Sequence, residues 1–355
     1  MITSYLLHPA LFGPGLRANK KELLRLFKII LKKNGLMLID HRARLVKLYE
    51  SQINSCLQGE GADADEIRRY MDLLIEDAGQ SGALRHYVKC KVKGDEDGDI
   101  ISAVAQQYDP DGVIVPDDFA EQAAKTSQAE KWGASVLPLS LYEDSKVEEN
   151  REAEEEAFHL TAIPRDMVRQ KFIRFLRYAK VIVLYDAYFA DGCRGREKWR
   201  AGVEYILDLV DQHSKMRTRS IIISFIARKQ YREDGRPCDD SVSKRAAKYF
   251  YDEIFLPIKR RYCEERERQN WQFECHVKES NNDFRDRYLK TDYSILSLSH
   301  GFDFLDSRTG AFRETSIRIE NAPRVVDPAT GITLPTTYDI VNGYENLPEY
   351  NYLGR

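Results

Sequence analysis

Apolar and polar residues follow one another in blocks that are typical of alternating strands and helices. In the first part of the chain, short apolar runs predict buried strands at 5–12, 35–40 and 111–118. Apolar residues at helical spacing predict helices at 19–31, 45–53 and 66–77. Because strands that alternate with helices form parallel sheets, residues 1–142 are predicted to form an α/β domain.

The second part of the chain continues this alternation. Apolar runs and helical spacing predict strands at 181–184, 220–226 and 273–277, and helices at 158–179, 203–210 and 246–268. A second α/β domain is therefore expected over residues 158–320. The acidic segment 143–157 is predicted to be a solvated linker. Residues 321–355 hold four prolines without clear periodicity, which predicts an extended tail.

The composition is that of a water-soluble globular protein, with 43% hydrophobic and 31% charged residues. No apolar run approaches the roughly 18–20 residues of a membrane span, and the first residues lack the pattern of a secretory signal. The six cysteines form no Cys-x-x-Cys pair, which argues against a zinc site or a disulfide framework. A reduced, cytoplasmic protein is expected.

The net charge of −3 is unevenly distributed along the chain. Residues 143–157 contain two basic and eight acidic side chains, whereas residues 158–355 contain 34 basic and 29 acidic ones. A mildly basic second half is compatible with nucleic acid or another anionic phosphate as its partner.

Carboxylates fall where strands of the first domain end. Asp40 and Asp117 follow two predicted strands, and Asp99 opens the short helix before the second of them. Ligands of parallel sheets bind at the carboxyl ends of the strands, and converging carboxylates bind hard cations. The pattern predicts a site for Mg²⁺ or Mn²⁺ with Asp40, Asp99 and Asp117 as ligands. The alternative is that these side chains cap helices and form turns.

Residues 99–119, together with Asp40, resemble the PIN-like nucleases. In that family an Asp at the start of a late helix and an Asp after the next strand bind the catalytic metal with other acidic residues. The resemblance implies that Glu50 stands in for a helical Glu of the family. One departure concerns the first strand, which ends in Asp in the family and in His8 here.

A second group of charged residues lies at 281–305, where two predicted strands form a hairpin. The first strand carries Arg285-Asp286-Arg287, and the second ends in Gly301-Phe302-Asp303-Phe304. This stretch resembles the phospholipase D-like domain at the C-terminus of MIT-domain proteins, and the resemblance extends over about 158–319. The family has His at the position of Arg285. A guanidinium cannot act as the phosphorus nucleophile, so the resemblance implies an anion-binding module without catalysis.

Alternation along a strand predicts that Arg285 and Arg287 share one face and hold an anion, with Asp286 on the other face. Asp303 is expected to orient one of these arginines. The alternative is a solvated Arg–Asp pair at the end of a hairpin. A further alternative keeps phosphodiesterase activity in this half, with His300 or His276 as nucleophile.

These patterns together favour a metal-dependent nuclease joined to a non-catalytic recognition domain, acting on RNA or DNA. By analogy this combination suits a bacterial immunity or stress effector. The alternative function is a binding protein without catalysis, whose second half recognises nucleic acid or phosphoinositide-like head groups. The tyrosine-rich tail is expected to contact a second copy or a partner protein.

Overall fold

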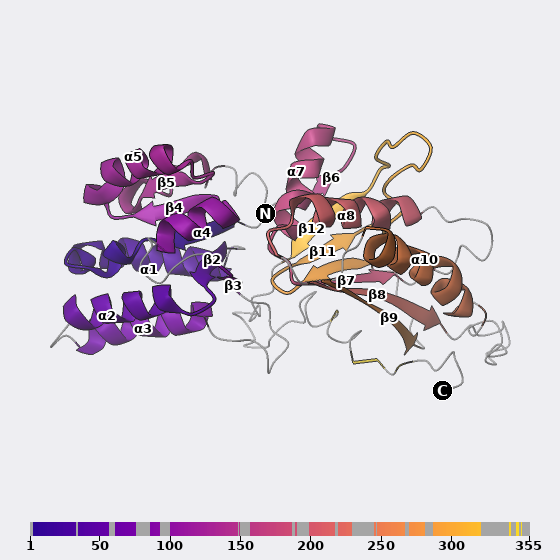
Figure 1. Ribbon diagram of the computed structural model, residues 1–355, viewed down its shortest axis with the longest axis horizontal. Helices are drawn as coiled ribbons and strands as arrows, with labels where there is room; N and C mark the ends of the chain where they lie inside the picture. Colours follow the sequence, from indigo (N-terminus) through magenta and orange to yellow (C-terminus); the bar gives the residue numbers. More distant parts are fainter. Residues whose placement is uncertain are drawn as a thin grey trace, which may run out of the picture. The chain divides into compact units, whose positions relative to one another are not determined.

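The computed structural model divides into two compact units, Met1–Glu155 and Glu156–Arg355, and each is described by itself (Figure 1). It describes residues 3–32, 35–56, 61–75, 86–92, 100–147, 149, 157–186, 189, 199–216, 219–228, 245, 247–266, 270–280, 287–320, 341, 346–347 and 349. None of the helices among these residues is long and apolar enough to cross a membrane.

The first unit is an α/β domain around a parallel sheet of five strands in the order β3-β2-β1-β4-β5. The strands are β1 (Thr3–Leu7), β2 (Gly35–Asp40), β3 (Tyr87–Cys90), β4 (Gly112–Val115) and β5 (Ser135–Pro138). Its α-helices are α1 (Leu16–Lys32), α2 (Arg44–Cys56), α3 (Gly61–Ile75), α4 (Ile100–Tyr108) and α5 (Ala120–Glu130). Helix α3 contacts both α1 and α2, and α4 contacts α5. Short 3₁₀ turns η1 (Pro9–Phe12), η3 (Asp117–Phe119) and η4 (Leu139–Leu141) follow β1, β4 and β5.

The predicted strand at 35–40 coincides with β2, in which all six residues are buried. The predicted strands at 5–12 and 111–118 are shorter in the structure, because the chain turns into η1 and η3 after the strand itself. Strands β3 and β5 have only four residues each and were not predicted. Such short strands are held by their neighbours in the sheet more than by their own apolar pattern.

The second unit contains a mixed sheet of seven strands in the order β6-β12-β11-β10-β7-β8-β9. The strands are β6 (Phe158–His159), β7 (Val181–Asp186), β8 (Arg219–Arg228), β9 (Trp271–Ser280), β10 (Tyr288–Thr291), β11 (Ile295–Leu298) and β12 (Ser316–Glu320). Strands β7, β8 and β9 are parallel, whereas β10, β11, β12 and β6 pair antiparallel. The helices are α7 (Arg165–Leu176), α8 (Arg200–His213) and α10 (Leu256–Lys259), the last between π-helical turns η6 (Phe250–Phe255) and η7 (Arg260–Glu265).

Two predicted helices differ from the structure. The helix predicted to start at residue 158 begins at Arg165, after Pro164 at its N-cap, and Phe158–His159 instead pairs with β12 as β6. The helix predicted over 246–268 contains π-helical turns on both sides of α10, which includes Pro257. Proline lacks the N–H group that a regular α-helix needs at an interior position, which accounts for the irregularity.

The hairpin expected near residues 284–298 is present as β10 and β11, with Leu289 opposite Leu296. Thr291 closes its turn by donating its N–H group to the Ser294 carbonyl. Residues 281–286, and with them Arg285 and Asp286, lie outside the described residues.

Strand β9 is the outer strand of this sheet on one side, and the tail reaches it at Glu349. The backbone of Glu349 forms an antiparallel bridge with Lys278. Its carboxylate lies 2.8 Å from His276 Nδ1 and 3.4 Å from Lys278 Nζ. The hydrogen bond with His276 is the main cause of a lowered pKa of Glu349. The tail therefore contacts the edge of the sheet through both its backbone and a side chain.

Candidate functional site

The parallel sheet of the first unit brings the carboxyl ends of β2, β1 and β4 to one edge in that order. Asp40 ends β2, His8 follows β1 and Asp117 follows β4. Adjacent strands are about 4.8 Å apart, so the axes of β2 and β4 are about 10 Å apart with β1 between them. The edge is thus a place where ligands of such sheets bind, and the directions of the side chains decide what it can hold.

Asp40 is fully buried and points into the start of α2. Its Oδ1 accepts the N–H group of Leu45 at 2.8 Å, and its Oδ2 accepts the N–H group of Arg42 at 3.1 Å and Nε of Arg44 at 3.4 Å. Burial alone would raise the pKa of Asp40, but these hydrogen bonds outweigh it and lower the pKa. Asp40 therefore anchors α2 to the end of β2, as a helix-capping carboxylate does.

His8 and Asp117 also contact the backbone of neighbouring turns. His8 Nδ1 accepts the N–H group of Ala10 at 3.2 Å and so caps η1. Asp117 is exposed, and its Oδ1 accepts the N–H group of Ser140 at 3.1 Å. That contact connects the turn after β4 to the turn after β5. Like Asp40, both side chains stabilise the chain where a strand ends.

No group of three His, Cys, Asp or Glu side chains in the described part of the chain lies close enough to share a metal ion. Glu50 lies on α2 and lines a pocket between α2 and α3 to which neither Asp40 nor Asp117 contributes. Asp99 lies outside the described residues, so its role as a ligand stays a prediction.

We expect Asp40→Asn to lower the free energy of unfolding at neutral pH by about 1–3 kcal/mol, because an amide cannot accept from all these donors. The folded-state pKa of Asp40 lies below the ordinary value of 3.8 for an aspartate side chain. Its contribution is therefore complete above that value and is lost as the pH falls through the lower folded-state pKa. Urea unfolding followed by circular dichroism at neutral and acid pH should show the gap between wild type and variant closing in acid.

Asp118→Asn is the matched control for this prediction, because Asp118 is an exposed carboxylate at the same sheet edge. It should unfold as wild type does at both pH values. A gap between Asp40→Asn and wild type that stays constant into acid would contradict the capping role of the Asp40 carboxylate.

In the second unit, an ion pair lies at the carboxyl end of β7. Asp186 is the last residue of β7, and its side chain is only 3% exposed. Its Oδ1 lies 3.7 Å from Nε of Arg287, whose Nη1 donates to the Ser299 carbonyl at 2.7 Å. The guanidinium is thus held from two sides while its side chain remains 18% exposed. A fixed and partly exposed arginine at the end of parallel strands is suited to binding an anion.

The close packing around this pair requires a glycine at position 301. Gly301 has a positive φ of 62°, and a Cβ atom there would lie 2.5 Å from both Asp186 Oδ2 and Arg287 Cδ. Its N–H group donates to the Leu298 carbonyl at 3.1 Å, which turns the chain directly over the pair. The Gly-Phe-Asp-Phe end of the hairpin therefore closes one side of the Asp186–Arg287 pair.

The expectation that Asp303 orients one of the two arginines is not met at Arg287. For Arg285, which lies outside the described residues, it stays a prediction. Asp303 Oδ1 accepts from Nη1 of Arg313 at 2.7 Å, and Nη2 of Arg313 donates to Asp306 at 3.0 Å. Both carboxylates of this turn therefore hold Arg313, whereas the orienting carboxylate of Arg287 is Asp186. The reason lies in the register: Arg287 precedes β10, which pairs with β7, so its side chain meets the end of β7.

The two histidines proposed as alternative nucleophiles lie in different surroundings. His300 is exposed and directly precedes Gly301, beside the Asp186–Arg287 pair. His276 lies on β9 and contacts Glu349 and Glu274. Of these two, only His300 is a neighbour in sequence of the residues that pack on Arg287.

Sequence reasoning missed two residues that hold Arg287 in this site, namely Asp186 and Ser299. Asp186 had a usable signal, because a single carboxylate ends a fully apolar strand at Val181–Asp186. Ser299 contributes only its carbonyl group, so its side chain type gives no signal. No model of a protein family matches the chain, and no curated protein or solved structure matches it either.

Proposed function

We propose that the protein binds an anionic phosphate group through the second unit and that nucleic acid carries this group. The observation that supports the proposal is the position of Arg287, held by Asp186 and the Ser299 carbonyl at the carboxyl end of β7. Orientation by a carboxylate reduces the conformational entropy that a guanidinium loses when it binds a phosphate. The basic excess of residues 158–355 adds long-range attraction for a polyanion.

His300 and Arg285 extend the proposed surface. His300 is exposed next to the Gly301 turn, so it is available to donate to a phosphate oxygen. Arg285 lies outside the described residues, and its participation rests on the alternation of Arg285, Asp286 and Arg287 in the sequence. In this proposal the second unit binds without catalysing a reaction, as its resemblance to a phospholipase D-like domain without the family's histidine implies.

Arg287→Lys is expected to weaken oligonucleotide binding, because lysine keeps the charge but loses the forked donor geometry of the guanidinium. Arg287→Ala should weaken it further, by about 1.5–3 kcal/mol for a lost charge-assisted contact. Binding of both variants and of wild type should decrease as the salt concentration rises. Fluorescence anisotropy with labelled single-stranded oligonucleotides measures these affinities, and vesicles with phosphate-bearing lipids form a second arm.

Arg308→Ala is the matched control, since Arg308 is an exposed arginine of the same unit and its loss changes the net charge equally. Arg308→Ala should retain most of the affinity. Thermal melting is followed in parallel. Unchanged binding by Arg287→Ala together with a large fall in melting temperature would mean that Arg287 has only a structural role. Binding to the vesicles alone would replace nucleic acid by a lipid head group.

A second candidate function is metal-dependent hydrolysis of RNA or DNA by the first unit. The strand order favours it, because the ends of β2, β1 and β4 are neighbours and Asp99 directly precedes α4. The capping contacts of Asp40 argue against Asp40 as a ligand, which leaves Asp99 and Asp117 as the residues to test.

We expect Asp99→Asn to abolish cleavage of RNA or DNA measured with Mn²⁺ or Mg²⁺, because the change removes a charge while keeping the shape. Asp118→Asn should cleave as wild type does. Nuclease activity that survives both EDTA and Asp99→Asn would exclude this candidate and leave the binding function alone.

A further inference from the structure

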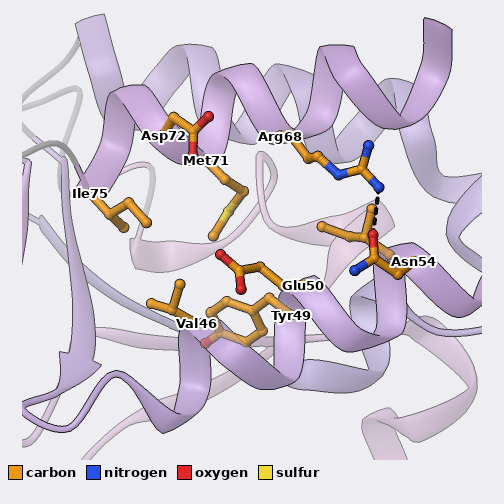
Figure 2. A pocket seen from close by; sticks show the side chains of 9 residues that line it. Val46, Tyr49, Glu50, Asn54, Arg68, Met71, Asp72 and Ile75 are labelled. Carbon is orange, nitrogen blue, oxygen red and sulfur yellow. Dashed lines mark hydrogen bonds between the residues drawn. The ribbon is translucent and has the colours of Figure 1, made fainter. Parts of the chain in front are cut away.

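Residues of helices α2 and α3 in the first unit line a pocket (Figure 2). Its apolar walls come from both helices. They are formed by Val46, Tyr49 and Ile53 of α2 and by Met71 and Ile75 of α3. The floor is rigid at Tyr49, which is fully buried and donates its hydroxyl group to the Leu7 carbonyl at 2.7 Å. The walls therefore offer an apolar surface backed by the core.

The charged side chains of the pocket differ in their partners. Arg68 donates to Asn54 and to Asp65, so its guanidinium is bound to neighbouring acceptors at one end (Figure 2). Glu50 points from α2 toward Met71 across the space between the helices (Figure 2). Among the described residues, no cation forms a salt bridge with Glu50 or with Asp72, the second carboxylate of the lining. The lining therefore combines apolar walls with two exposed carboxylates, Glu50 and Asp72, and one guanidinium, that of Arg68, which gives it a net charge of −1.

The volume of the pocket limits the size of its occupant. The cavity measures about 210 Å³, below the ~300–1,000 Å³ of pockets for drug-sized ligands. At about 30 Å³ per water molecule, this is the space of roughly seven waters. An alkyl chain of six carbons with one terminal amino group has a similar size.

We infer that this pocket binds a small amphipathic cation, namely an alkyl or aryl ammonium group. The apolar part packs on Val46, Ile53 and Met71, and the ammonium group pairs with Glu50. Charge complementarity selects an ammonium over a carboxylate, because the latter would meet Glu50 and Asp72 with like charge. This site is independent of the anion-binding function of the second unit, and it gives Glu50 a role other than metal ligation.

The test compares three probes with the same apolar body: n-hexylamine, n-hexanol and n-hexanoate. Titration calorimetry on the full chain measures their affinities, and the ¹³C-methyl NMR signal of Met71 locates the binding. Hexylamine should bind more tightly than hexanol, hexanoate should bind most weakly, and the Met71 signal should move with hexylamine. Glu50→Gln should weaken hexylamine binding about fivefold, as expected for one partly exposed ion pair, and should abolish the preference for the amine over the alcohol.

Glu121→Gln is the matched control, because Glu121 is an exposed glutamate on α5 outside the pocket. It should bind all three probes as wild type does. Equal affinities of wild type for hexylamine and hexanol would overturn the inference. So would hexylamine binding that Glu50→Gln leaves unchanged, or a Met71 signal that does not respond to hexylamine.

Discussion

Gly202→Ala should destabilise the second unit by about 1–3 kcal/mol, as forced overpacking of a filled interior does. In an unconstrained helix interior the same change stabilises by about 1 kcal/mol, so the sign is reversed. The reason is that a Cβ atom at Gly202 would clash with the Phe302 carbonyl oxygen. Helix α8 and the turn after β11 meet at this glycine without room for a methyl group.

The measurement is best made in a Trp132→Phe background. The chain has three tryptophans, and the remaining Trp199 and Trp271 are buried in the second unit. Their fluorescence during urea unfolding therefore reports on that unit alone. Ala201→Gly is the neighbouring control, with an expected loss of about 1 kcal/mol from helix propensity. A Gly202→Ala protein as stable as its parent would show that α8 and the turn are not in tight contact.

Gly301→Ala is expected to reduce both stability and anion binding. The positive φ of 62° costs an alanine about 1–2 kcal/mol. In addition, its Cβ atom would lie 2.5 Å from Asp186 Oδ2 and Arg287 Cδ, which forces the ion pair apart. The total loss should therefore exceed the backbone cost. Unfolding in the Trp132→Phe background and anisotropy with labelled oligonucleotides measure the two effects.

Gly310→Ala separates the backbone cost from the contact with the ion pair. Gly310 has nearly the same φ, 65°, but the nearest atom to a Cβ there is Nη2 of Arg165 at 3.6 Å. This control should lose only the backbone cost and retain its affinity for oligonucleotides. Equal losses of stability in the two variants would mean that the Asp186–Arg287 pair adapts to a methyl group.

The sequence predicts those elements whose apolar pattern matches their burial. Strand β2 is buried on both faces, so a continuous apolar run from Gly35 to Ile39 marks it. The β10–β11 hairpin is likewise marked by apolar residues on both sides of a polar turn. Strand β6 is different, because its two residues form a strand only by pairing with β12, which is more than 150 residues away. Local pattern carries no information on such a partner.

For the site residues as well, the position along the chain is predictable from local sequence, whereas the contacts depend on the rest of the fold. The position of Asp40 and Asp117 at strand ends was readable, but their hydrogen bonds to the backbone of Leu45 and Ser140 depend on how each turn closes. Proximity in the hairpin predicts that Asp303 orients Arg285 or Arg287, but it does not reveal which carboxylate pairs with Arg287. The pairing of β10 with β7 determines the actual partner, Asp186, and this pairing is a property of the whole sheet.

The bridge between Lys278 and Glu349 has a consequence for how the protein behaves at high concentration. An open outer strand such as β9 is a template on which another chain can form a cross-strand assembly. The fraction of molecules that pair with one another rises as the protein is concentrated, whereas a segment of the same chain has a fixed effective concentration. The segment at Glu349 therefore competes with a second molecule for β9 equally well at any protein concentration. Its side-chain contacts with His276 and Lys278 stabilise the pairing within the chain.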